Sequence, residues 1–414
     1  MSIIFKGNEP YLEEVCIKDI IDSNKTPFYL YSQKIIIDTY HQLKNDLNSE
    51  IFFAIKANSN QAILKLINQL GAGADVVSIG ELKRALSAGF EPSKIIFEGV
   101  GKSKEDIEFA INKKIRLINA ESINEIIMID EISRKLNTTV DIGVRLNPNV
   151  DAKTLDKIST GRKTDKFGIN IEKLEEVIKL IQSLKGIKLK GISCHIGSQL
   201  SNIKIFENTF EIMKKAAEYV LSNDINLEHV DLGGGFAVNY EQDVNDLNTK
   251  KIGEITKSIF KNCKYNVSFE PGRYLVAKSG FIITKILSLK KNSTINFLIT
   301  DAGMQTLLRP SMYGAKHRVQ ALNNLGNKLV NYTIAGPICE SSDIILKDIR
   351  LPSQKINNYL IINDVGAYGS VMSSNYNSRG FPSEILIHKN NFCNTYEGQN
   401  ISEIIQQYKI PDWI

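Results

Sequence analysis

The sequence lacks the cysteine and hydrophobic patterns that mark secreted or membrane proteins. Its cysteines are odd in number, and none are spaced as CxxC, which argues against a disulfide framework or zinc site and favours a reducing compartment. No apolar stretch is long enough to span a membrane, and the first residues, MSIIFKGNEPYLEEV, contain no long apolar segment of the signal-peptide type. We therefore expect a cytoplasmic protein with no membrane partner. The five cysteines are Cys16, Cys194, Cys263, Cys339 and Cys393.

Strong net charge is also missing. The 414 residues carry a formal charge of only +5, and no basic run is interleaved with aromatic residues, so we expect no nucleic-acid partner. A slightly positive surface suits small anionic substrates. With 43% hydrophobic and 23% charged residues, the composition is that of a folded globular chain, long enough for two domains.

Short apolar runs recur through the first two thirds of the chain. Segments with helical apolar spacing separate them, for example QAILKLINQL (61–70) and LEEVIKLIQSL (174–184). Apolar strands that alternate with helices are typical of a parallel sheet covered by helices. Eight such units predict a (β/α)8 TIM barrel, with an open doubly wound sheet as the competing fold. The runs are IFFAI (51–55), ADVVS (74–78), IIFEG (95–99), RLINA (116–120), VDIGVRLN (140–147), LKGISCHI (189–196), HVDLGG (229–234) and VSFEP (267–271).

The pattern changes after about residue 275. Apolar runs continue there, separated by turns without intervening helices, which predicts a C-terminal β-sandwich or β-barrel domain. We expect the N-terminal segment with PFYLYS (27–32) to complete this domain. The predicted boundaries are 33–275 for the barrel and 1–32 plus 276–414 for the β domain. The runs are FIITKILSL (281–289), TINFLIT (294–300), YTIAG (332–336), IILKDIRL (344–351) and NYLIIND (358–364).

Ionisable and polar side chains stand where the barrel strands end. Active sites of such barrels lie at the carboxyl ends of the strands, so this placement predicts one polar cluster. The longest strand-to-helix connection, 152–168, could be a mobile lid over that face or a solvated loop. The strand-end side chains are Lys56, Asp75, Glu98, Asn119, Arg145, His195, Glu270 and Arg273.

Two motifs near the barrel's end suggest an anion site. In DLGGG (231–235), three glycines allow backbone N–H groups to approach an anion, although a tight turn would also need glycine. In FEPGRYL (269–275), Gly272 could add another N–H, and the planar fork of Arg273 suits a carboxylate. Glu270 and Arg273 could instead form a structural pair at a turn.

Lys56, Glu270 and the glycine loop together match the needs of a pyridoxal phosphate enzyme. A lysine amine must bind the cofactor aldehyde, an acid must keep the pyridine nitrogen protonated, and an anion cradle must hold the phosphate. Taken alone, Lys56 could be an edge residue with its charge in water. His195, in CHIGSQ, is a candidate to lie against the cofactor ring, although a single strand-end histidine is more often a core residue.

The motifs FFAIKANSN, GADVVSIGEL, SCHIGSQL, DLGGGF, FEPGRYLV, RPSMYGAKH, CESSD and DVGAYG resemble the fold-type III, alanine-racemase-like pyridoxal phosphate decarboxylases. They stand in the family's order from about residue 27 to about 385. The resemblance implies pyridoxal 5'-phosphate as cofactor, a small amino-acid substrate, no metal, and a homodimer with active sites shared across its interface. The residues that match the family's cofactor contacts are Lys56, Asp75, His195, Ser198, Gly233, Gly234, Gly235, Glu270, Gly272, Arg273 and Tyr368.

The resemblance also implies substrate contacts. Arg273, Arg309 and Tyr313 match a clamp on the distal carboxylate, Glu340 matches the contact to the distal amine, and Tyr368 lies near both phosphate and substrate. Cys339 matches a proton donor that the family supplies from the second subunit.

The expected reaction is decarboxylation of meso-2,6-diaminopimelate to L-lysine, the last step of lysine biosynthesis, with Lys56 and Cys339 as catalytic residues. A substrate without a distal carboxylate has no use for Arg309, which disfavours ornithine, arginine and carboxynorspermidine. Three more distant readings remain: a racemase, expected to use a tyrosine in place of Cys339; a non-catalytic pyridoxal-phosphate-binding barrel, which would lack the β domain; and a sugar-phosphate barrel enzyme, which would not need Lys56.

Overall fold

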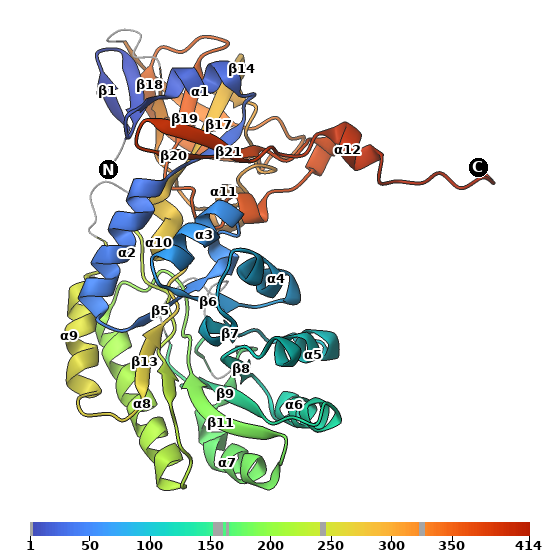
Figure 1. Ribbon diagram of the computed structural model, residues 1–414. Helices are drawn as coiled ribbons and strands as arrows, with labels where there is room; N and C mark the ends of the chain where they lie inside the picture. The colour runs from blue at the N-terminus through green and yellow to red at the C-terminus, as the bar shows by residue number, and fades with distance from the viewer. Residues whose placement is uncertain (1–2, 152–159, 163–164, 241–245, 323–327) are drawn as a thin grey trace. The chain divides into compact units, whose positions relative to one another are not determined.

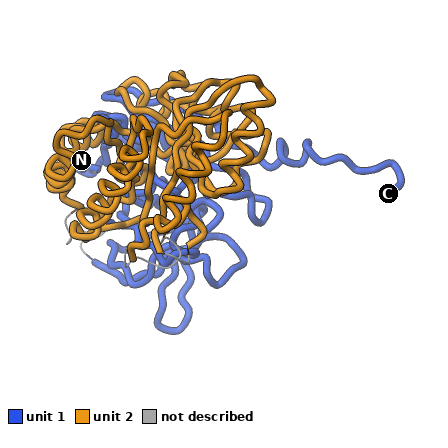
Figure 2. The backbone as a smooth tube through the Cα atoms, turned by 90° about the horizontal axis from the view of Figure 1, so that it is seen from below, with its two compact units in different colours: residues 1–37, 240–244, 276–414 blue, residues 38–239, 245–275 orange. Residues whose placement is uncertain are grey.

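The computed structural model describes residues 3–151, 160–162, 165–240, 246–322 and 328–414. The predicted lid over 152–168 lies largely outside these residues. The chain forms two compact units, coloured in Figure 2. Unit 1 comprises residues 1–37, 240–244 and 276–414, and unit 2 comprises residues 38–239 and 245–275. No helix in the described ranges has the length and apolar character needed to cross a membrane.

Unit 2 contains a closed barrel of eight parallel strands. Each strand pairs with the next in chain order, and the last pairs with the first through Phe269 and Ile51, which closes the sheet. The eight predicted strands all contribute, so the barrel prediction is confirmed and the open-sheet alternative is wrong. The strands are β5 (Glu50–Ala54), β6 (Gly73–Val76), β7 (Ile95–Phe97), β8 (Leu117–Ala120), β9 (Val140–Asn147), β11 (Ile187–Ser193), β12 (His229–Asp231) and β13 (Asn266–Phe269).

The turn from strand to helix is fixed by N-cap residues. The side chains of Asn60, Ser78, Ser103 and Ser122 each accept a backbone N–H of the helix that follows. Such caps satisfy donors that the first helical turn leaves free. Figure 1 shows the helices flanking the barrel strands. They are α2 (Gln33–Leu47), α3 (Gln61–Gln69), α4 (Ile79–Ser87), α5 (Lys104–Lys113), α6 (Ile123–Lys135), α7 (Leu174–Ser183), α8 (Ile203–Ser222) and α9 (Thr249–Ile259).

Unit 1 contains a nine-stranded mixed sheet. The N-terminal strand β4 (Phe28–Ser32) lies between β14 (Gly280–Asn292) and β20 (Ser383–His388), antiparallel to the first and parallel to the second. The predicted β domain with an N-terminal contribution is therefore confirmed. The remaining strands are β15 (Ile295–Thr300), β16 (Val319–Ala321), β17 (Leu329–Ala335), β18 (Ile344–Pro352), β19 (Tyr359–Ile362) and β21 (Asn391–Tyr396).

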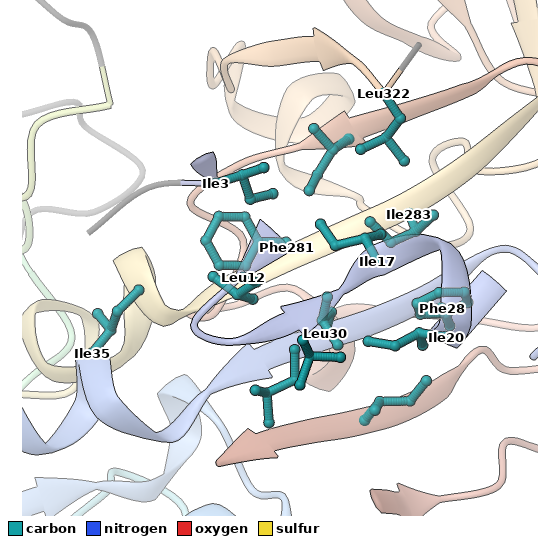
Figure 3. Close-up of a cluster of buried hydrophobic side chains, with 14 residues drawn as sticks. Ile3, Leu12, Ile17, Ile20, Phe28, Leu30, Ile35, Phe281, Ile283 and Leu322 are labelled. Atoms are coloured by element: carbon teal, nitrogen blue, oxygen red, sulfur yellow. The ribbon is translucent and has the colours of Figure 1, made fainter. Parts of the chain in front are cut away.

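A buried apolar cluster explains why the N-terminal segment belongs to this unit. Phe28 and Leu30 of β4 lie with Phe281 and Ile283 of β14 in one cluster of buried side chains (Figure 3). Helix α1 (Ile17–Ser23) covers the cluster with Ile17 and Ile20, which are both fully buried. Burying such side chains contributes roughly 1.5–3 kcal/mol each, so this segment is held by the hydrophobic effect. Three further short strands precede α1: β1 (Ile4–Lys6), β2 (Glu9–Leu12) and β3 (Val15–Cys16).

The prediction that no helix interrupts the later strands is wrong at one place. Between β15 and β16 the chain forms a short helix, α11 (Arg309–Tyr313). Pro310 occupies the first turn, where its missing N–H costs nothing, and Gly314 ends the helix with φ +64°. Five residues are too few to show a helical period in the sequence, so only the Pro and Gly positions signalled this helix.

Candidate active site

Lys56 stands where β5 ends, on a single 3₁₀ turn. Its Nζ lies 2.9 Å from Oδ2 of Asp75, the penultimate residue of the neighbouring strand β6, which is fully buried. The Lys56 side chain keeps 38% of its surface exposed. Burial raises the pKa of Asp75, and the charge of Lys56 opposes that shift. The amine is therefore held by a buried carboxyl group and is still reachable, unlike an edge lysine that only extends into water.

Glu270 directly follows β13 and is buried. In the described parts of the chain, its Oε1 finds no hydrogen-bond partner. Burial raises the pKa of Glu270 well above its usual range, and the nearby carboxyls of Asp231 and Asp75 add to the shift. An unsatisfied buried oxygen is costly, so this position fits a ligand that offers or shares a proton.

The glycine loop after β12 makes a tight turn and packs closely against neighbouring backbone. Gly233 and Gly235 have φ values of +69° and +81°, which side chains rarely adopt. A Cβ at Gly234 would collide with the Glu270 carbonyl, and one at Gly235 with the Gly197 carbonyl. The loop therefore packs directly on the ends of the adjacent segments, with no room for side chains.

Asp231 anchors this loop, a role that was not predicted from the sequence. Its Oδ1 accepts the Gly233 N–H at 2.6 Å, and its Oδ2 accepts the Ser268 hydroxyl. Burial raises the pKa of Asp231 to about 7. The sequence offered one signal for this role: Asp231 stands two residues before Gly233 in DLGGG, and aspartate side chains often accept the backbone N–H two residues further along.

Replacing Gly234 by alanine tests the cradle. The added Cβ must displace the Glu270 backbone, so we expect affinity for pyridoxal phosphate to fall about tenfold or more and stability to fall by about 1–3 kcal/mol. Titration of the cofactor-free protein with pyridoxal phosphate measures the first effect, and thermal unfolding measures the second. Gly101→Ala is the matched control, because a Cβ there meets nothing within 4 Å. Unchanged affinity in Gly234→Ala would show that this loop does not hold the phosphate.

His195 lies just beyond the end of β11 and contacts the glycine loop. Its Nδ1 accepts the Gly234 N–H at 3.2 Å. Burial lowers the pKa of His195 well below its usual value, and the positive charges of Arg145 and Lys56 add to this. The ring is therefore neutral, as suits a group that lies flat against another ring. Arg273 donates to the Ser198 hydroxyl from Nε at 3.3 Å and from NH2 at 3.1 Å, so these two predicted residues also meet.

A buried network of strand-end groups supports the acidic side chains. Arg145 NH1 lies 3.0 Å from Oε1 of Glu121 and 3.7 Å from Oε2 of Glu98. Glu98 also accepts hydrogen bonds from Ser193 at 2.9 Å and from Asn119. Three of these residues, Glu98, Asn119 and Arg145, are among the strand-end side chains predicted from the sequence, but no role was predicted for them. A buried cation is needed there because several carboxyl groups lie inside the same barrel.

Apart from Arg273, which lies in unit 2, the predicted substrate residues lie in unit 1. Arg309 is buried, with NH1 2.9 Å from Nε2 of His317, and its guanidinium lies 4.7 Å from the centre of the Tyr240 ring. Nδ1 of His317 is 3.0 Å from the Asn363 carbonyl oxygen. The first and last residues of RPSMYGAKH thus contact each other, and His317 orients the arginine. Tyr313 is half-buried.

Cys339, Glu340 and Tyr368 also belong to unit 1. Cys339 and Glu340 are exposed on a loop, where Tyr376 donates to Oε1 of Glu340 at 2.6 Å and the Cys339 N–H donates to Asn377 at 3.3 Å. Tyr368 is half-buried with φ +55°. Within unit 2 the structure brings together Lys56 with Asp75, Ser198 with Arg273, and the glycine loop with His195 and Glu270. The assembly of both groups of residues around one substrate remains a prediction.

The unit 2 residues fit pyridoxal phosphate. The unsatisfied Glu270 oxygen suits its pyridine nitrogen, the glycine loop suits its phosphate, and the held amine of Lys56 suits its aldehyde.

Comparison with known proteins agrees with this chemistry. Residues 33–277 match the family model described as pyridoxal-dependent decarboxylase, pyridoxal binding domain. The chain is 40% identical over 369 residues to a diaminopimelate decarboxylase of Helicobacter pylori (strain J99), covering 87% of this chain and 90% of the relative. It is 32% identical to that of Aquifex aeolicus (strain VF5), covering 97% and 96%. A crystal structure of diaminopimelate decarboxylase from M. jannaschii in co-complex with L-lysine superposes with a TM-score of 0.92 at 33% identity, covering 99% of this chain and 98% of the other.

Proposed function

The chain belongs to the pyridoxal-dependent decarboxylase family of fold type III, and we propose from this premise that it decarboxylates meso-2,6-diaminopimelate to L-lysine and carbon dioxide. The observation that carries the proposal is that one barrel holds a strand-end amine, Lys56, bonded to Asp75, and a buried carboxyl, Glu270, with an unsatisfied oxygen. Relatives 32–40% identical over nearly their whole length carry the name of this activity.

The predicted cofactor residues contact different parts of pyridoxal phosphate. Pyridoxal phosphate, when bound, supplies an electron-accepting ring that stabilises the negative charge left on Cα as carbon dioxide departs. Lys56 binds the aldehyde, and the carboxyl of Glu270, which has an unsatisfied buried oxygen, shares a proton with the pyridine nitrogen. Asp75 holds the Lys56 amine, and the neutral ring of His195 provides a flat face. Gly233, Gly234, Gly235, Gly272 and Ser198 hold the phosphate, with Tyr368 nearby.

The substrate is recognised at its far end, which is itself an amino acid. Arg309, Arg273 and Tyr313 bind the distal carboxylate, and Glu340 binds the distal amine. The contact with His317 fixes the direction of the Arg309 guanidinium, so little side-chain freedom is lost on binding. A substrate without this carboxylate would lack the anion that these arginines are proposed to bind, and such a difference discriminates strongly.

Carbon dioxide release from four substrates tests the proposal. The protein is assayed with meso-diaminopimelate, ornithine, arginine and carboxynorspermidine, with and without added pyridoxal phosphate. We expect kcat/KM for the first to be at least about 10⁴-fold above that for the others, because only diaminopimelate has the distal carboxylate that Arg309 and Arg273 are proposed to bind. Preferred turnover of ornithine or arginine would favour the alternative, a related basic amino-acid decarboxylase of this fold.

The active protein is proposed to be a homodimer in which Cys339 of one copy serves the site of the other. Its thiol protonates Cα after carbon dioxide leaves. Cysteine is one of the side chains that can act as a general acid in proteins. The exposure of Cys339 in the single chain supports such sharing, and the reducing compartment predicted from the cysteine pattern would keep the thiol free.

Replacing Cys339 by alanine should lower turnover about 10²-fold or more, because proton transfer loses its donor, and leave cofactor binding unchanged. The absorbance of the bound cofactor and the rate of lysine formation measure the two effects separately. Cys393→Ala, a change at another exposed cysteine of the same unit, is the control. Mixing Cys339→Ala with Lys56→Ala copies should restore about a quarter of full activity if sites are shared in a two-fold dimer. Absence of any recovery would contradict sharing.

A further inference from the structure

The last residues of the chain form an apolar segment that its own unit leaves uncovered. Helix α12 (Ile401–Ile405) is held by a capping box between Asn400 and Glu403, and Ile404 is buried. Beyond it, Ile410 and Trp413 are 81% and 86% exposed. Figure 1 shows this segment extending from α12 away from the sheet of unit 1. We call residues 405–414 the tail; its exposed apolar side chains are Ile405, Tyr408, Ile410, Trp413 and Ile414.

The composition of the tail is that of a bound segment and not of a solvated one. Half of its ten residues are large and apolar, and its two charges, Lys409 and Asp412, cancel. It contains no glycine, and Pro411 restricts its backbone, so ordering it on a surface loses comparatively little entropy. Its backbone hydrogen bonds in the described structure are local, such as Ile414 N–H to the Pro411 carbonyl at 3.2 Å. Exposed apolar groups of this size mark interaction sites.

The tail leaves unit 1 beside residues that are proposed to face a second subunit. Gln399 exchanges two backbone hydrogen bonds with Phe381, at 2.9 and 3.2 Å. Phe381 closely follows the turn at Tyr376 and Asn377, whose side chains bond Glu340 and the Cys339 N–H. The root of the tail is therefore continuous with the loop that the proposed dimer shares.

The same neighbourhood exposes apolar side chains that could receive a tail. Tyr376, Val371 and Met312 are all exposed. Hydrogen bonds join their segments: Ser374 N–H to the Gln305 carbonyl at 2.9 Å, and the Ser311 hydroxyl to the Ser342 carbonyl at 2.7 Å. We call Met312, Val371 and Tyr376 the receiving surface. Tail and receiving surface lie on one chain, so a two-fold contact would use each of them twice.

From these observations we propose that the tail packs on the receiving surface of a second copy of this chain and helps to hold the dimer together. The inference rests on the dimer proposed above. Trp413 is its main contact, since tryptophan buries the largest apolar surface and dominates the energetics of many interfaces.

Trp413 also reports on the proposal, because it is the single tryptophan of the chain. The cofactor-loaded full chain is diluted while sedimentation measures the fraction of dimer and acrylamide quenching measures access to Trp413. We expect blue-shifted, protected emission in the dimer and red-shifted, accessible emission in the monomer. Solvent-like emission in the dimer would overturn the inference. Equal protection in monomer and dimer would also overturn it, because the tail would then fold on its own chain.

Variants of the tail and of the receiving surface give a second test. Deleting residues 407–414, or Trp413→Ala, should raise the dimer dissociation constant about tenfold or more, as expected of an interface anchor. Met312→Asp should do the same and expose Trp413 in whatever dimer remains. Lys409→Ala, within the tail but without an apolar side chain, is the control and should have no effect. Unchanged dissociation in the deletion would overturn the inference.

The outcomes separate this inference from the proposed function. Lack of diaminopimelate turnover together with a protected Trp413 in the dimer would contradict only the proposed function. Full turnover by a dimer with an accessible Trp413 would contradict only the inference that the tail packs on a second copy. A chain that stays monomeric at all concentrations would overturn both this inference and the proposed sharing of Cys339.

Discussion

Lys56→Ala should lose more than about a thousandfold in the rate of diaminopimelate decarboxylation, the largest effect expected of any single change in this chain. The physical reason is that no other residue in the described barrel presents an amine to Asp75 at the end of β6. Borohydride reduction followed by mass spectrometry should attach cofactor to the peptide containing Lys56 in the wild type and leave the variant unlabelled.

Two controls separate the lost amine from a damaged fold. Lys65→Ala removes an exposed lysine from the helix that follows and should leave both rate and labelling unchanged. Adding methylamine to Lys56→Ala should restore part of the rate, because a free amine can replace the missing group in a site that is otherwise intact. Full activity in Lys56→Ala, or cofactor attached to another lysine, would contradict the proposed function.

Glu270→Ala is expected to lower turnover about 10²-fold or more but to weaken cofactor binding by less than about tenfold. The carboxyl acts on the charge of the ring, while the glycine loop and Lys56 supply the other contacts that hold the cofactor. The measurements are kcat under saturating cofactor and the dissociation constant for pyridoxal phosphate. Equal losses in both quantities would show that Glu270 only helps to bind.

Glu270→Gln gives a further readout that needs no bound cofactor. Burial raises the folded-state pKa of Glu270 above its unfolded value, so the folded chain holds this proton more tightly. The contribution of Glu270 to stability is therefore fully present below the unfolded pKa and is lost as pH rises through the raised, folded-state pKa. The amide cannot ionise, so the variant should lose less stability with rising pH than the wild type. Melting temperatures of the cofactor-free proteins across pH measure this. Parallel curves would mean that Glu270 is already ionised without cofactor.

The barrel could be predicted because parallel strands buried on both faces leave continuous apolar runs in the sequence. Short helices and the exact ends of strands were harder to predict from the sequence. Helix α11 has only five residues. Strand β11 ends at Ser193, although the apolar run in the sequence continues to Ile196. Cys194 and Ile196 are buried beyond the strand, so apolarity there reports burial and not pairing.

The candidate site could be predicted in part. Strand-end positions identified Lys56, Asp75 and Glu270, because the barrel rule fixes which end of a strand carries the chemistry. The anchoring of the glycine loop by Asp231 had a local signal in DLGGG that was not used. The orientation of Arg309 by His317 could not be predicted, because it depends on a distance that no sequence period fixes.

The sequence by itself determined the order of strands and helices, the side chains at each strand end and, through its motifs, the family. These are local properties, set by hydrophobic periodicity and by the chemistry of single residues. Only the tertiary structure decided that the Lys56 amine meets the buried Asp75, that an oxygen of Glu270 is left unsatisfied, and that the apolar tail remains uncovered. The pairing and burial of side chains depend on which distant segments of the chain pack together, and only the folded structure fixes that.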